Sequence, residues 1–117
     1  MPRADAARNV LVTSAGNKLP LLRATSEALR RLNSHWNVIA GDSDSTCPAS
    51  FLNTFFWHTP DWKNVGADFL IRELKERSVA IILPTRDGEL DFWAEMSPAL
   101  RDHGIEVIVS RSESLRV

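Results

Sequence analysis

Residues 81–89 read Ile-Ile-Leu-Pro-Thr-Arg-Asp-Gly-Glu, an apolar run that passes directly into a group of polar side chains. Such a run, ended by turn-forming residues, is typical of a buried strand in a parallel sheet. Ligands of open α/β sheets bind just beyond the carboxyl ends of the strands. A guanidinium there can hold a carboxylate or phosphate, and a carboxylate can hold an amine or act as a base. The candidate ligand-binding residues of this stretch are Thr85, Arg86, Asp87 and Glu89. In the structural alternative, Arg86 pairs with Asp87, or Asp87 caps the next helix.

A second junction of the same kind lies near the N-terminus, where residues 10–18 read Val-Leu-Val-Thr-Ser-Ala-Gly-Asn-Lys. Its hydroxyls, its glycine and the free N–H groups of the following helix predict a site for an anion or carboxylate. The candidate residues here are Ser14, Ala15, Gly16 and Asn17. The alternative is a turn capped by Ser14 or Asn17. A nicotinamide dehydrogenase is disfavoured, because its fingerprint needs three spaced glycines and only Gly16 is present.

Strands and helices are expected to alternate along the whole chain. Hydrophobic periodicity predicts strands at 9–13, 36–41, 54–58, 79–83 and 105–109, and helices at 20–33, 61–78 and 89–103. We expect residues 43–50 to form a loop, Phe69 to face inward, and the last helix to restart at Ser97 and Pro98. The fold class predicted is α/β, a small doubly wound Rossmann-like three-layer domain with a mostly parallel sheet of about five strands.

Asp42 ends the second expected strand, where an acid holds a ribose hydroxyl in dinucleotide-binding folds. The alternative is a solvated aspartate in a turn. Asp44, Cys47 and His58 are the nearest potential metal ligands in the sequence, but their spacing matches no metal motif. We therefore assign no metal ligand and no catalytic residue to this chain.

Composition places the chain among ordinary single-domain proteins: it has 117 residues, of which 44% are hydrophobic and 25% charged. A net charge of −1 gives no electrostatic reason to expect nucleic acid or an anionic membrane as a partner. One cysteine excludes an internal disulfide, and no apolar run approaches the roughly 18 residues that span a bilayer. A cytoplasmic location is the expectation. The tryptophan- and phenylalanine-rich middle of the chain allows a docking surface or a homodimer.

The chain resembles the N-terminal, pre-ATP-grasp domain of ATP-grasp enzymes, and most nearly the carbamoyl-phosphate synthase large-subunit-like branch. The resemblance rests on residues 9–16, Asp42, residues 82–90 and residues 104–110. It implies a Rossmann-like domain placed before a catalytic domain that binds ATP and magnesium, activates a carboxylate as an acylphosphate and joins it to an amine. By resemblance, the residues that line the substrate pocket or the domain interface are Ser14, Ala15, Gly16, Asp42, Thr85, Arg86, Asp87 and Glu89.

The resemblance also sets expectations for domains, cofactors and partners. The family continues past the point that corresponds to Val117, so we expect residues 1–117 to be one domain of a longer protein, with no cofactor and no ATPase activity of its own. The expected partners are its own C-terminal ATP-grasp domain and a small-molecule carboxylate or amine. Two other classes remain open: a free-standing Rossmann-like module for a nucleotide or small acid, and an interaction module.

Overall fold

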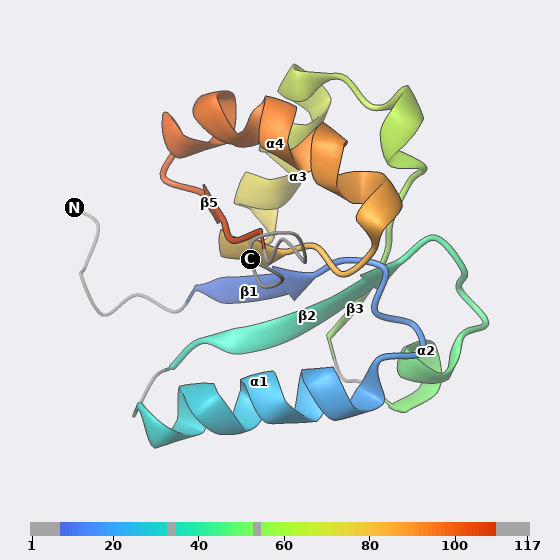
Figure 1. Ribbon diagram of the computed structural model, residues 1–117. Coiled ribbons are helices and arrows are strands. Elements are labelled where there is room, and N and C mark those ends of the chain that lie inside the picture. Colours follow the sequence, from blue (N-terminus) through green and yellow to red (C-terminus); the bar gives the residue numbers. More distant parts are fainter. Residues whose placement is uncertain (1–7, 33–34, 53–54, 110–117) are drawn as a thin grey trace, which may run out of the picture.

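The computed structural model describes residues 8–32, 35–52 and 55–109, which form a parallel sheet covered by helices (Figure 1). Its strands are β1 (Asn9–Val12), β2 (Asn37–Asp42), β3 (Phe56–His58), β4 (Val79–Leu83) and β5 (Glu106–Val107). They lie in the order β3-β2-β1-β4-β5, and every neighbouring pair is parallel. This arrangement confirms the predicted doubly wound, Rossmann-like domain.

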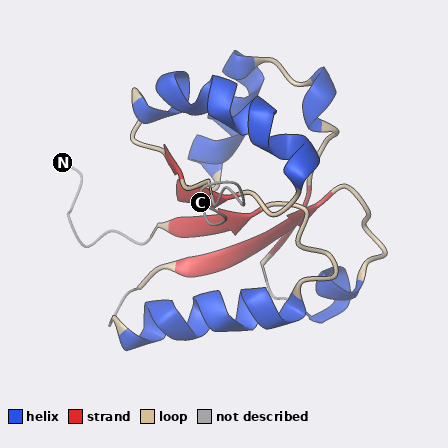
Figure 2. Cartoon of the chain, in the orientation of Figure 1, coloured by secondary structure: helices blue, strands red, loops and turns tan. Residues whose placement is uncertain are grey.

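Helices cover both faces of the sheet, which gives the three expected layers (Figures 1 and 2). The helices α1 (Leu19–Arg31) and α2 (Pro48–Leu52) lie on one face, and α3 (Ala67–Glu76) and α4 (Asp87–Arg101) on the other. A short 3-10 helix, η1 (Trp62–Asn64), precedes α3. None of these described helices has both the length and the apolar character needed to cross a bilayer.

Each face of the sheet has its own hydrophobic core, because successive side chains of a strand point to opposite faces. Along β1, Val12 packs in the core that also contains Leu22 of α1, whereas Leu11 packs in the core that contains Leu70 of α3 and Trp93 of α4. The second core is the more aromatic, with Trp57, Trp62 and Trp93 in it. The buried, β-branched strands of the sequence therefore lie between two helical layers, as parallel strands do.

The strand order creates a topological switch point between β1 and β4. From β1 the chain moves outward through β2 to β3, and then crosses the sheet through α3 to place β4 on the other side of β1. Val12 pairs with Ala40 on one side and Leu83 on the other, so β1 and β4 end at the same edge. The chain leaves β1 for α1 on one face of the sheet and leaves β4 for α4 on the other, and ligands of open α/β sheets bind beyond the strand ends at such a point.

Four details differ from the sequence-based expectations. The predicted loop at 43–50 contains the start of α2, which Pro48 begins because proline fits the first turn of a helix. The helix expected over 61–78 is divided, since Gly66 is the N-cap of α3. Phe69, which was expected to face inward, is 42% exposed. The helix α4 does not restart at Ser97 and Pro98. It runs through Pro98, held on the sheet by buried side chains on both sides of the proline.

Candidate functional site

The two polar junctions seen in the sequence meet at the switch point. The Thr85 hydroxyl donates to the backbone oxygen of Thr13 at 2.6 Å and to that of Ser14 at 3.1 Å. The backbone N–H of Thr13 donates to the carbonyl of Leu83 at 3.1 Å, which extends the β1–β4 pairing into the loops. The loop after β1 and the loop after β4 are thus one connected structure.

Glu89 joins these loops through its side chain. One of its carboxylate oxygens, Oε1, accepts hydrogen bonds from the Thr13 hydroxyl at 2.7 Å and the Trp93 indole N–H at 3.0 Å. The other, Oε2, accepts from the Ser14 hydroxyl. Glu89 is only 8% exposed and lies in the first turn of α4, where the free N–H groups of a helix favour a carboxylate. A buried polar group is stable inside a protein when it is hydrogen-bonded, and these three donors meet that requirement.

Asp42 holds the β1–α1 loop from its other side. Its Oδ2 accepts the backbone N–H of Gly16 at 2.7 Å, and its Oδ1 accepts the backbone N–H of Asp44 at 2.9 Å. An alanine at position 16 would place its Cβ 2.6 Å from that Oδ2 and 2.7 Å from the Cβ of Cys47. Only a glycine therefore allows the loop, Asp42 and the start of α2 to approach this closely.

The remaining candidates of the N-terminal loop do not lie in a shared site. Ala15 is fully buried in the core under α1, so its side chain is not available to a ligand. Asn17 is exposed. The alternative in which Ser14 or Asn17 caps α1 is wrong: the N-cap is Lys18, without a side-chain cap bond, and the Ser14 hydroxyl is bound to Glu89.

A pocket of about 360 Å³ opens at the switch point, and we call it the switch-point pocket. Its lining residues are Ser14, Ser43, Thr59, Pro60, Asp61, Trp62, Arg86, Gly88, Glu89 and Phe92. Three of them, Ser14, Arg86 and Glu89, were candidates from the sequence. Asp87 is exposed and outside the lining, and it does not cap α4, whose N-cap is Arg86 without a side-chain cap bond. Among the described residues, no ion pair joins Arg86 to Asp87.

The residues that the sequence analysis missed come mainly from the segment after β3. Thr59, Asp61 and Trp62 follow the third strand in the same way that the other candidates follow β1 and β4. The same rule, polar residues at the carboxyl end of a parallel strand, would have found Thr59 and Asp61. Nothing in the sequence indicates that Phe92 faces the pocket, because this depends on how α4 packs against η1.

The pocket combines an aromatic wall with charged and hydroxyl groups. Trp62 stacks on Phe92 with ring centroids 6.0 Å apart and lies edge-on to Trp93 at 5.0 Å. Arg86 supplies a guanidinium and Asp61 a carboxylate, each on an exposed residue. A small ligand with a carboxylate, an amine or both finds a complementary group here, and its apolar part can contact the rings.

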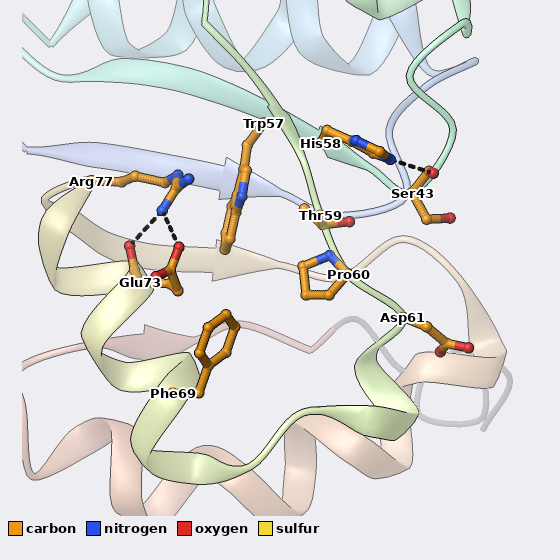
Figure 3. A pocket seen from close by; sticks show the side chains of 9 residues that line it. All are labelled: Ser43, Trp57, His58, Thr59, Pro60, Asp61, Phe69, Glu73 and Arg77. Atoms are coloured by element: carbon orange, nitrogen blue, oxygen red, sulfur yellow. Dashed lines mark hydrogen bonds and ion pairs between the residues drawn. The ribbon is translucent and has the colours of Figure 1, made fainter.

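A second, more open hollow of about 630 Å³ lies along the segment after β3 (Figure 3), and it shares Ser43, Thr59, Pro60 and Asp61 with the switch-point pocket. There the Arg77 guanidinium lies 4.0 Å from the Trp57 ring centroid and forms an ion pair with the Glu73 carboxylate at 2.9 Å. His58 Nε2 lies 3.0 Å from the backbone oxygen of Ser43. Its Arg77 and Glu73 are thus already paired with each other. The switch-point pocket is the better candidate site, because it lies beyond the carboxyl ends of β1 and β4, where ligands of open α/β sheets bind.

Potential metal ligands do not gather in the part of the chain that the structure describes. No group of three or more His, Cys, Asp or Glu side chains there could hold a metal ion. Asp44 is instead part of a local turn, in which its carboxyl accepts hydrogen bonds from the side chain and the backbone N–H of Thr46. These two bonds, with the side-chain bond the larger cause, lower the pKa of the Asp44 carboxyl, and the charge of His58 adds to the effect.

Comparison with known proteins identifies a family to which the chain is similar. Residues 10–108 match the family described as PylC-like, N-terminal domain, which is associated with ATP-grasp enzymes. No curated protein matches the chain. The family match covers most of the sequence and includes both junctions of the switch point. The match supports the resemblance to ATP-grasp enzymes. It does not confirm the more specific resemblance to the carbamoyl-phosphate synthase-like branch.

Proposed function

This chain belongs to the PylC-like N-terminal domain family, and we propose that it is the substrate-side domain of an ATP-dependent carboxylate–amine ligase. In this proposal an ATP-grasp domain of the same polypeptide binds ATP and magnesium and forms the acylphosphate. The present domain holds a small carboxylate or amine substrate in the switch-point pocket and is not catalytic alone. A carbamoyl-phosphate synthase-like ligase is the form of this activity that the sequence resemblance favours.

The observation that carries the proposal is the pair of opposite charges at the switch-point pocket. Arg86 and Asp61 both line it, together with the hydroxyls of Ser14, Ser43 and Thr59. A guanidinium binds a carboxylate through two parallel hydrogen bonds, and a carboxylate binds an ammonium group. A ligase that joins a carboxylate to an amine needs a site for groups of this kind. The pocket lies at the topological switch point, beyond the carboxyl ends of the strands, where ligands of open α/β sheets bind.

The internal contacts decide which residues meet the ligand. Asp42 accepts two backbone N–H groups and Glu89 accepts three side-chain donors, so both carboxylates already serve the loops. Arg86 lies on the exposed lip of the pocket, at the N-terminus of α4. We therefore assign carboxylate binding to Arg86. Asp61 is proposed for amine binding on its place in the lining of the pocket alone, with the hydroxyls as supporting hydrogen-bond partners.

Ligand binding is tested by titrating the ¹⁵N-labelled chain with sodium acetate and with methylammonium chloride, with sodium chloride as the salt control. Removing the guanidinium in Arg86→Ala should raise the acetate Kd about tenfold, because a hydrogen bond to a charged group is lost. The matched control is Arg23→Ala, which removes an exposed arginine of α1. Equal acetate affinity in the wild type and in both variants would show that Arg86 does not bind carboxylates.

The ligase part of the proposal is tested on the natural gene. We expect the reading frame past Val117 to encode a glycine-rich lid and acidic magnesium ligands. We also expect the longer protein to release ADP from ATP when supplied with a pool of small carboxylates and amines. A frame without these features would favour the alternative, a free-standing module that binds a small acid.

A further inference from the structure

We infer that Glu89 is a positioning residue: its buried carboxylate holds Ser14 and the β1–α1 loop in the conformation that forms one wall of the switch-point pocket. The sequence alone suggested that Glu89 contacts the substrate or acts as a base. The effect on ligand binding rests on the proposed function, whereas the effect on the loop rests on the contacts of Glu89 alone.

The contacts of Glu89 engage both of its carboxylate oxygens. Its donors come from three places in the fold: Thr13 at the end of β1, Ser14 in the loop that follows, and Trp93 one turn further along α4. Both carboxylate oxygens are engaged, and the side chain is buried. A ligand group that took the place of one of these donors would leave a hydroxyl or the indole N–H without its partner, which is costly inside a protein.

The loop needs such a restraint because Ser14 has a left-handed backbone. Its φ is 51°, a region that residues with a Cβ rarely adopt. Three interactions hold it there: its own hydroxyl donates to Glu89, its carbonyl accepts the Thr85 hydroxyl, and the next residue, Ala15, donates to the Gly41 oxygen at 2.9 Å. Of these three, the Glu89 bond is the one that ties the Ser14 side chain to α4.

Glu89 thereby fixes the distance between two groups that line the pocket. Arg86 lies three residues before it at the start of α4, where its carbonyl accepts the Glu89 N–H at 3.0 Å, and Ser14 lies on the opposite loop. Loss of the carboxylate removes the restraint on the Ser14 side chain, so that only the two backbone hydrogen bonds oppose a return of Ser14 to an ordinary backbone conformation. The pocket wall then moves relative to Arg86, although no ligand contact has been removed.

The first test needs no ligand and compares Glu89→Ala and Glu89→Gln with the wild type by NMR. Trp93 reports on the site, because its indole N–H donates to Glu89. We expect this indole proton to shift upfield in both variants, and the Ser14 Cα and Cβ shifts to leave left-handed values in Glu89→Ala. Glu89→Gln keeps the size of the side chain and one acceptor oxygen, so it should show a smaller change of the same sign. Unchanged Trp93 and Ser14 signals in the variants would overturn the inference.

The matched controls are Glu95→Ala and Glu95→Gln, which remove the same charge from an exposed position of the same helix. Their Trp93 and Ser14 signals should equal those of the wild type. Should Glu89→Ala not fold, the comparison of Glu89→Gln with Glu95→Gln decides the question by the same two signals.

The second test separates positioning from direct contact by the direction in which the Kd values for acetate and for methylammonium change. If Glu89 faced the ligand, removing its negative charge would strengthen acetate binding and weaken methylammonium binding. If it positions the loop, Glu89→Ala should raise both Kd values about tenfold, the size expected when a left-handed residue is released. Opposite changes for the two probes would overturn the inference. If the wild type binds neither probe, the proposed function fails at this pocket, and the Trp93 and Ser14 signals still decide the role of Glu89.

Discussion

Replacing Gly16 with alanine tests whether the β1–α1 loop is held as tightly as the contacts suggest. The new Cβ would lie 2.6 Å from Oδ2 of Asp42 and 2.9 Å from the Cys47 sulfur, closer than carbon atoms approach in folded proteins. It would also lie 2.7 Å from the Cβ of Cys47, which cannot move without its backbone. The carboxylate of Asp42 can rotate away, but it then loses the N–H of residue 16.

Two costs follow from this clash. Overpacking a well-packed site costs about 1–3 kcal/mol, and losing a hydrogen bond to a charged group costs about 1.5–3 kcal/mol. Because part of the strain is relieved when Asp42 moves, we expect a total loss of about 2–4 kcal/mol in the free energy of unfolding. For a domain of this size that lowers the thermal midpoint by roughly 8–16 °C. Thermal unfolding followed by circular dichroism measures it.

Gly88→Ala is the matched control, because it is the same change at a glycine with open space around it. Apart from its chain neighbours and the backbone of its own helix, no heavy atom of the described residues lies within 4 Å of a Cβ at Gly88, which is the second residue of α4. Alanine is a better helix residue than glycine by about 0.5–1 kcal/mol, so this variant should melt a few degrees higher than the wild type. A midpoint for Gly16→Ala at or above that of the wild type would refute the packing argument.

Three further predictions concern stability and ionisation. Thr85→Val keeps the shape of the side chain but removes the donor to two loop carbonyls; it should cost about 1–2 kcal/mol in urea unfolding, and an unchanged midpoint would contradict this. Trp62→Ala opens a cavity in the buried aromatic core and should cost about 3–5 kcal/mol; a loss below 1 kcal/mol would show that its packing is not stabilising. Thr46→Ala should raise the pKa of Asp44 towards its ordinary value in an NMR titration, because the Thr46 side chain is the largest cause of the lowered pKa; an unchanged pKa would assign the effect elsewhere.

The sequence was sufficient to predict the parallel sheet, and to predict that its two polar junctions lie at the same edge. Short apolar runs such as Val79–Leu83 could be assigned to buried strands, and in a parallel sheet the ends of such strands share one edge. Right-handed crossovers then leave few possible strand orders. The element boundaries could not be predicted as well. The apolar periodicity continues across the break at Gly66, and Leu70 and Leu74 face inward whether the helix begins before or after it.

The roles of the charged residues could not be obtained from the sequence. Position after a strand made Asp42 and Glu89 candidates for ligand binding, yet each bonds to a loop residue far away in the chain: Gly16 is 26 residues from Asp42, and Ser14 is 75 residues from Glu89. Such partners are set by the three-dimensional fold. The segment after β3 was missed for a related reason: its contribution to the pocket depends on the crossing from β3 to β4.

The measurement that tests the central claim most directly is a ¹H–¹⁵N map of the chain titrated with sodium acetate and, separately, methylammonium chloride. We predict that the largest shifts fall on backbone signals of the switch-point pocket, at Ser14, Ser43, Asp61 and Arg86, and that sodium chloride at equal ionic strength does not reproduce them. Shifts that are absent, or that centre on α1 and α2 on the opposite face of the sheet, would contradict the assignment of this pocket as the substrate site.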